Sequence, residues 1–202
     1  METQEKTSEK IMKILVKEPL TEHTATALAK TLGMSRQGLW KTLSRLAREK
    51  LILLKSIAET KRSALNITLN FKNPITPKMI SIVLEKETLK YERWKDNFAE
   101  LQSHCKFIIL FGSILHSPKE ANDIDLLVVV KENKDFNAID EIVLKLQKTQ
   151  IRKIHMTDLT EEEFKKELKK NKNKAYLDAL KKGIILSGHD DYVNFSEELS
   201  QK

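Results

Sequence analysis

The sequence predicts an α+β protein of two domains joined by a long linking helix. Residues 1–73 have the pattern of three helices followed by two short strands. Residues 74–103 contain neither glycine nor proline after Pro77. Residues 104–190 alternate apolar strands with amphipathic helices, which indicates a mixed sheet covered by helices. Residues 191–202 are expected to form a C-terminal tail.

The composition is that of a folded globular protein. The chain has 202 residues, of which 40% are hydrophobic and 32% charged, and disordered chains have fewer hydrophobic residues. No apolar run reaches the roughly 18 residues that a membrane helix needs. The first ten residues lack the apolar core of a signal peptide. The single cysteine, Cys105, excludes internal disulfides and fits a reducing compartment. We therefore expect a cytoplasmic protein without a membrane partner.

The positive charge is confined to the first part of the chain. The net charge is +7, and residues 1–76 carry 14 Lys and Arg against 7 Glu, with no Asp. Residues 77–202 carry 22 basic and 22 acidic residues, so they are neutral. This asymmetry favours contact between the first part and a polyanion. The alternative is that lysine-rich helices lie there without such a partner.

Three helices are expected in the first part. Residues 7–17 have apolar side chains at helical spacing. A second helix, at about residues 24–32, ends at Gly33, which suits the left-handed turn after a helix. Ser35 is the expected N-cap of a third helix that runs to about Lys50.

The third helix has one apolar and one polar face. Leu39, Leu43 and Leu46 recur at core spacing. The opposite stripe carries residue types that contact phosphates and base edges in a major groove. A basic tip between the two following strands could lie against the DNA backbone. The alternative for the stripe is a solvated helix face. The residues expected to contact double-stranded DNA are Arg36, Gln37, Lys41, Ser44, Arg48, Lys61 and Arg62.

The segment ATALAKTLGMSRQGLWKTLSRLAREKLI, with the two strands after it, resembles the winged helix-turn-helix of MarR- and ArsR-type transcription regulators. The resemblance covers about residues 5–70. It implies a DNA-binding domain and a role in transcription regulation.

The linking helix carries an apolar stripe with two interpretations. Its residues follow alternating steps of three and four, interrupted at Glu87: Ile80, Leu84, Tyr91, Trp94, Phe98 and Leu101. The stripe could pair with the same helix of a second subunit. It could equally pack on the C-terminal domain. A homodimer would suit a winged helix that reads two-fold DNA sites.

The stretch FIILFGSILHSPKEANDIDLLVVV contains the candidate chemical site. Two apolar runs predict buried strands, and the first ends at Gly112 and Ser113. Gly112 allows a ligand to approach the backbone, and Ser113 adds a hydroxyl beside turn amides that favour phosphate. Asp123 and Asp125 point to the same face of the second strand. Two converging carboxylates are suited to Mg²⁺ that also binds substrate phosphates.

This stretch resembles the nucleotidyltransferases of the DNA polymerase β-like superfamily, especially their minimal members. The likeness covers about residues 104–190 and extends to the ending AYLDALKKGIILSG. It implies that Gly112 and Ser113 bind the triphosphate of an NTP. Asp123 and Asp125 would be the catalytic metal ligands, for Mg²⁺ or Mn²⁺.

One departure from the family pattern concerns the next strand, IRKIHMT. The superfamily usually takes a third carboxylate there, whereas this strand contains His155. Asp158 follows, but we expect it in the turn that leads into the next helix. We therefore expect His155 to lie beside Asp123 and Asp125.

Three functions are compatible with these patterns. The first is a DNA-binding, metal-dependent nucleotidyltransferase. The second is a transcription regulator whose degenerate transferase domain senses a nucleotide or mediates assembly. The third is an antitoxin-like transferase that modifies a partner protein.

Overall fold

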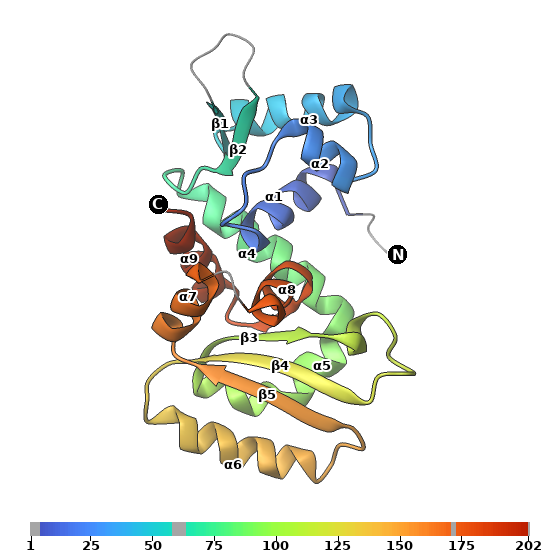
Figure 1. Ribbon diagram of the computed structural model, residues 1–202, viewed down its shortest axis with the longest axis vertical. Coiled ribbons are helices and arrows are strands. Elements are labelled where there is room, and N and C mark those ends of the chain that lie inside the picture. Colours follow the sequence, from blue (N-terminus) through green and yellow to red (C-terminus); the bar gives the residue numbers. More distant parts are fainter. Residues whose placement is uncertain (1–4, 58–63, 171–172, 202) are drawn as a thin grey trace. The chain divides into compact units, whose positions relative to one another are not determined.

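The computed structural model combines helices with a two-stranded hairpin and a four-stranded mixed sheet (Figure 1). It describes residues 5–57, 64–170 and 173–201. These residues form two compact units. The N-terminal unit contains the residues up to Val83 together with those from Ser196 onward, and the C-terminal unit is Leu84–Phe195. Within the described ranges, no helix is both long and apolar enough to cross a membrane.

The N-terminal unit has the predicted winged-helix order of three helices followed by a hairpin. Its elements are α1 (Thr7–Lys17), α2 (Ala25–Thr31), α3 (Arg36–Arg48), β1 (Ile52–Ser56) and β2 (Leu65–Leu69). The two strands pair antiparallel. The predicted helix positions and the N-terminal part of the fold class are confirmed.

Local signals fix the helix ends in this unit. The side chain of Thr24 accepts a hydrogen bond from the backbone of Ala27 (3.2 Å), and that of Ser35 accepts one from Gly38 (3.1 Å). Each satisfies an amide that the helix leaves without an internal partner. Gly33 between α2 and α3 has a φ of 63°, the left-handed conformation that glycine adopts most easily. These features set the turn that precedes α3.

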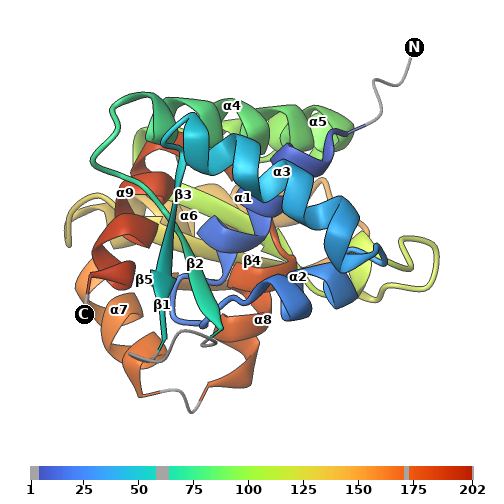
Figure 2. The same ribbon diagram turned by 90° about the horizontal axis from the view of Figure 1, so that it is seen from above.

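The core of the N-terminal unit is formed by the apolar stripe of α3 against α1 and the hairpin. Leu39, Leu43 and Leu46 are fully buried. The hairpin lies beside α3, in contact through β1 (Figure 2). The backbone amide of Ile67 donates to the carbonyl of His23 (2.8 Å), which ties β2 to the segment before α2. The apolar face of α3 is therefore used for packing, and its other face stays exposed.

The expectation of one long linking helix is wrong. The segment comprises α4 (Ile75–Thr88), α5 (Glu92–Asn97), and two 3₁₀ turns, Leu89–Tyr91 and Ala99–Ser103. At the first break, the buried hydroxyl of Thr88 lies within hydrogen-bonding distance of the carbonyls of Leu84 (3.1 Å) and Ile185. Such a bond to the carbonyl four residues earlier bends helices.

The apolar stripe of this segment packs inside the C-terminal unit. Four of its predicted members belong to or contact the buried cluster under the sheet: Tyr91, Trp94, Phe98 and Leu101. For these residues, packing on the C-terminal domain is the interpretation that holds. A homodimer stays a prediction.

The C-terminal unit is built on a sheet in the order β5-β4-β3-β6. Its strands are β3 (Cys105–Phe111), β4 (Asp123–Val130), β5 (Lys153–Leu159) and β6 (Ile184–Ser187). Strands β4 and β5 are parallel, and the other neighbours are antiparallel. The helices are α6 (Asp135–Gln147), α7 (Glu161–Lys169), α8 (Lys174–Lys182) and α9 (His189–Ser200), the last of which extends into the N-terminal unit. The predicted mixed sheet is confirmed.

Helices cover both faces of this sheet, with α6 on one side and α8 on the other (Figure 1). Ile124 and Leu126 of β4 belong to the buried cluster that includes Ile139 of α6. On the opposite face, the ring of Phe107 contacts those of Tyr192 and Phe195. Burial on both faces explains why β3 and β4 are continuous apolar runs.

Two expectations about the C-terminal part of the chain are wrong, one about its last residues and one about Asp158. Residues 191–200 belong to helix α9 (His189–Ser200) rather than to a tail, because the side chains of Tyr192, Phe195 and Leu199 are buried at helical spacing. Asp158 lies within β5, paired with Val128, rather than in the turn after it.

Candidate metal centre and nucleic-acid interface

The polar face of α3 is open to solvent. Five of the predicted DNA-contacting residues are exposed along it: Arg36, Gln37, Lys41, Ser44 and Arg48. Arg45 is exposed as well and lies one turn after Lys41, although the sequence analysis did not select it. Its basic side chain at that spacing was a usable signal. The other two predicted residues, Lys61 and Arg62, lie outside the described part of the chain.

Strand register brings the candidate chemical residues together at one edge. Phe111, the last residue of β3, pairs with Asp125 of β4, so that Gly112 and Ser113 follow directly at the same end. Asp125 also pairs with His155 of the parallel strand β5. Directly paired residues project to the same face of a sheet. Three strands therefore supply one site.

The three side chains of this site form a compact set of donors. The Nδ1 atom of His155 lies 3.2 Å from Oδ2 of Asp123 and 3.8 Å from Oδ1 of Asp125. Ligand atoms of all three residues lie within 4.8 Å of one another. The predicted position of His155 beside the two aspartates is thus confirmed.

Asp158 does not supply a third carboxylate to this cluster. It lies three residues after His155 in β5, so that its side chain points to the opposite face of the sheet. Burial raises the pKa of Asp158, and the charges of Asp140 and Glu163 add to the effect. Asp140 belongs to α6, which covers that opposite face. Within the described chain, His155 therefore holds the position next to the aspartate pair.

The environment of Asp125 favours a bound cation. Burial, and next the neighbouring Asp123 carboxylate, raise the pKa of Asp125, whereas His155 opposes the increase. A nearby positive charge would stabilise the ionised form of both carboxylates. The donor set of two carboxylates and one imidazole therefore fits a divalent metal ion.

Gly112 is required by its contact with Asp125. Its φ of 82° and ψ of −162° lie in a region that is essentially open only to glycine. A Cβ at this position would lie 2.0 Å from Oδ2 of Asp125. The absence of a side chain therefore lets the carboxylate lie directly over the backbone. Ser113, which begins the 3₁₀ turn Ser113–Leu115, is exposed beside it.

Arg152 is a supporting residue that the sequence analysis missed. Its Nε atom donates to the carbonyl of Ala121 (2.7 Å), and its Nη2 atom donates to that of Pro118 (2.5 Å). Both acceptors lie in the loop between Ser113 and Asp123. The guanidinium thus fixes this loop to the start of β5. No local sequence signal marks an arginine whose partners lie 31 and 34 residues away.

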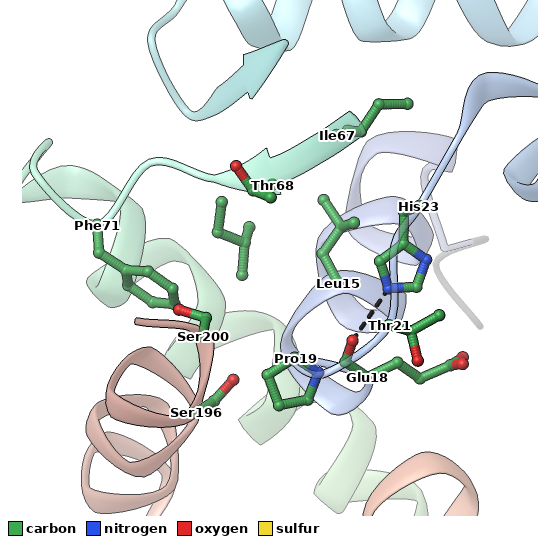
Figure 3. Close-up of a pocket in the computed structure, with 11 residues that line it drawn as sticks. Leu15, Glu18, Pro19, Thr21, His23, Ile67, Thr68, Phe71, Ser196 and Ser200 are labelled. Atoms are coloured by element: carbon green, nitrogen blue, oxygen red, sulfur yellow. Dashed lines mark hydrogen bonds between the residues drawn. The ribbon is translucent and has the colours of Figure 1, made fainter. Parts of the chain in front are cut away.

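A separate pocket in the N-terminal unit does not suit a nucleotide (Figure 3). Its volume is about 30 Å³, which leaves room for only a few water molecules. His23, which lines it, donates through Nε2 to the carbonyl of Glu18 (3.1 Å). This histidine therefore has a structural partner, and the cluster of Asp123, Asp125 and His155 remains the candidate chemical site.

The chain was compared with curated proteins, solved structures and family models. No curated protein gave a match. Among solved structures, a double mutant of ZitR from Lactococcus lactis is 22% identical, covers 48% of this chain and 64% of its own, and gives a TM-score of 0.36. A mutant of MepR from Staphylococcus aureus is 20% identical, covers 50% of this chain and 83% of its own, and gives a TM-score of 0.35. Both are winged-helix regulators of the MarR family.

The chain therefore spans less than two thirds of the length of ZitR. The winged-helix description of the N-terminal unit rests on its own element order, α1-α2-α3-β1-β2.

The C-terminal part matches a family model. The model, described as "Polymerase beta, Nucleotidyltransferase", aligns with residues 95–191. This range begins in α5 and includes the whole sheet with Gly112, Asp123, Asp125 and His155. Residues 95–191 of this chain are therefore similar to the nucleotidyltransferases that this model describes.

Proposed function

We propose that this protein is a metal-dependent nucleotidyltransferase that is directed to double-stranded DNA by its winged helix. The observation that carries the proposal is the convergence of Asp123 and Asp125 over Gly112, inside the region that is similar to nucleotidyltransferases. The substrate would be an NTP, whose nucleotidyl group is transferred to an acceptor while pyrophosphate leaves from the α-phosphorus.

The residues of the site have distinct roles in this proposal. Asp123 and Asp125 would hold the cation, Mg²⁺ or Mn²⁺. When bound, such an ion neutralises the charge that develops on the phosphates during transfer. Gly112, whose side-chain space holds the Asp125 carboxylate, would bind the triphosphate through its backbone, and the exposed hydroxyl of Ser113 can donate to a phosphate oxygen. Arg152 keeps the loop between these two pairs of residues in place.

The winged helix would supply the DNA contacts. The exposed face of α3 carries Arg36, Lys41 and Arg48, and residues 1–76 hold the whole excess of positive charge. Phosphate contacts from such residues give affinity that depends strongly on salt. A homodimer that reads two half-sites would fit this mode of binding, and sedimentation with and without DNA measures it. A cytoplasmic location also stays a prediction.

The test is transfer of label from α-labelled ATP, CTP, GTP and UTP with Mg²⁺ or Mn²⁺. DNA, RNA and protein are offered as acceptors, and Asp125→Asn serves as the inactive variant. Asp96→Asn, which removes an exposed carboxylate of α5, is the matched control. Transfer that is lost only in Asp125→Asn supports the proposal. Absence of both transfer and NTP binding at the wild-type site contradicts it.

A second candidate is a transcription regulator with an inactive transferase domain. The observation that favours it is His155, which stands next to the aspartates where family members usually have a third carboxylate. In that case, the protein would bind DNA, and a nucleotide would change the DNA affinity without being transferred. Measuring DNA affinity with and without each NTP, alongside the transfer assay, separates the two candidates.

A further inference from the structure

We propose that His155 is a metal ligand and that it makes the site of Asp123 and Asp125 selective for Mn²⁺ or another first-row transition ion over Mg²⁺. This inference rests on the proposed function, because that function brings a divalent cation to the aspartate pair. It adds the identity of the third ligand and the class of ion.

The distances between the three donors suit one shared cation. Metal–ligand bonds of about 2.1 Å place neighbouring ligands of an octahedral ion about 3.0 Å apart and opposite ligands about 4.2 Å apart. The His155 Nδ1 atom lies 3.2 Å and 3.8 Å from its nearest oxygens on Asp123 and Asp125. Small side-chain rotations would therefore bring all three donors onto one ion.

The backbone around His155 holds it on a well-fixed strand. The side-chain oxygen of Gln147 accepts from the amide of Ile154 (2.8 Å), and its nitrogen donates to the carbonyl of Arg152 (3.0 Å). These bonds tie the start of β5 to the end of α6. Register then sets His155 directly opposite Asp125. The backbone of His155 is therefore fixed by the fold, and its side chain leaves the strand on the same face as that of Asp125.

The site is also accessible from solvent. Strand β5 is at the edge of the sheet, and 47% of the His155 side chain is exposed, against 31% for Asp123 and 25% for Asp125. A cation can thus enter without a rearrangement of the fold. Three protein ligands would leave coordination positions for water and for the phosphates of a substrate.

The chemistry of the donors decides the class of ion. Mg²⁺ is a hard cation that prefers oxygen ligands in octahedral geometry. Imidazole nitrogen suits Zn²⁺, Ni²⁺ and other transition ions, whereas carboxylate oxygen suits both Mn²⁺ and Mg²⁺. Replacing one carboxylate with an imidazole also removes one negative charge. The lost charge weakens the binding of both ions, whereas the change from oxygen to nitrogen weakens the binding of Mg²⁺ more than that of Mn²⁺.

The experiment compares the binding of Mn²⁺ and Mg²⁺, measured by calorimetry on the full chain with a non-hydrolysable NTP analogue present. The variants are His155→Asp, which introduces a third carboxylate, and His155→Ala, which removes the ligand. His116→Ala is the matched control, because His116 is another exposed histidine outside the three-donor cluster. Thermal melting of each variant verifies that it is folded.

We expect His155→Ala to lose at least about tenfold in Mn²⁺ affinity, the scale on which even supporting residues affect metal sites, with little change for Mg²⁺. His155→Asp should raise Mg²⁺ affinity and lower the ratio of Mn²⁺ to Mg²⁺ affinity. His116→Ala should leave both unchanged. In the wild type, electron spin-echo spectra of bound Mn²⁺ should contain modulation from a histidine nitrogen, and His155→Ala should lack it.

Two contrary outcomes have different meanings. If Mg²⁺ and Mn²⁺ bind but neither affinity changes in His155→Ala, and no nitrogen modulation is seen, the inference is wrong while the proposed function stands. If no divalent ion binds beyond what the NTP analogue binds in the absence of protein, then the proposed function fails together with the inference.

Discussion

The two candidate functional surfaces of this protein are built in opposite ways. The basic surface of the N-terminal unit lies on one helix, α3, and consists of long exposed side chains. The cluster of the C-terminal unit combines short side chains from β4 and β5 with the backbone after β3. The first surface can lose a side chain without a change in the fold. The second depends on separations of a few ångströms between strands, so that its function and its packing are coupled.

The largest expected effect is that of replacing Gly112 in the C-terminal unit, compared with replacing Gly33 in the N-terminal unit. Gly112→Ala should force the Asp125 carboxylate to move, since the new Cβ would lie 2.0 Å from Oδ2. It would also place a non-glycine residue in a strained conformation that costs about 1–3 kcal/mol. We expect a clearly lower melting temperature and loss of cation binding, measured by calorimetry.

Gly33→Ala is the matched control for this change. Gly33 also has a positive φ, of 63°, but no atom of the described residues beyond Gly33 and its two chain neighbours lies within 4 Å of the position of a Cβ there. Gly33→Ala should destabilise the protein only because alanine is placed in the left-handed conformation, by about 1 kcal/mol. Cation binding should stay intact. Equal losses of cation binding in the two variants would contradict the role assigned to Gly112.

The next effect concerns the basic surface. Removing two charges from α3 with Lys41→Ala and Arg48→Ala should reduce DNA affinity roughly 10- to 100-fold at about 0.1 M salt. The slope of log affinity against log salt should become shallower by about 2. Fluorescence anisotropy over a salt series measures both quantities, and the melting temperature should not change.

The control for the basic surface removes the same charge elsewhere. Lys119 and Lys148 are exposed residues of the C-terminal unit, and their replacement with alanine lowers the net charge equally. If this pair weakens DNA binding as much as the α3 pair, then general charge rather than α3 explains the binding.

A smaller effect is expected at Arg152, which differs from the arginines of α3 because its guanidinium is bound to the backbone. Arg152→Ala removes the hydrogen bonds to Pro118 and Ala121 and should destabilise the protein by about 1–2 kcal/mol. Denaturant unfolding measures this, and hydrogen exchange in residues 116–122 should become faster. Arg48→Ala provides the contrast, with no expected loss of stability.

The smallest expected effect is a gain of stability, on replacing Asp125 with asparagine. Since the pKa of Asp125 is raised by burial and then by Asp123, the folded protein holds this proton more tightly than the unfolded chain does. The carboxyl therefore contributes stability below its unfolded pKa near 4, and this contribution is lost as the pH rises through the folded value. Asp125→Asn removes the charge permanently.

At neutral pH and without metal, Asp125→Asn should therefore melt at a slightly higher temperature than the wild type. The gain should vanish below about pH 4, where Asp125 is protonated in both states. Thermal melts across this pH range test the sign. A less stable variant at pH 7 would show that the ionised carboxylate has a stabilising partner.

The contrast between the two surfaces also explains what the sequence could predict. The elements around α3 follow from local signals, such as the caps at Thr24 and Ser35 and the leucines at helical spacing. Gly112, Asp123 and Asp125 were identified because they lie at the ends of strongly apolar strands. Each of these signals lies within a few residues of the feature that it predicts.

The errors arose where distant contacts decide the structure. The break at Thr88 depends on a carbonyl 97 residues away, and no local helix breaker marks it. Arg152 was missed for the same reason. Helix α9 is different, since the spacing of Tyr192, Phe195 and Leu199 was readable in the sequence. The position of His155 beside the aspartates was predicted. Its distances to the two carboxylates depend on the pairing of β4 with β5, which only the structure gives.

The contribution of α9 to the N-terminal unit has a consequence for how that unit is made. Ser196 is buried and donates from its hydroxyl to the carbonyl of Val16 (2.7 Å), 180 residues earlier in the chain. Leu199 is buried as well. In linear order, the C-terminal unit is thus an insertion within the N-terminal one. During synthesis, the residues up to Val83 leave the ribosome before Ser196 and Leu199 do, so the N-terminal unit can be completed only after the whole C-terminal unit has been made.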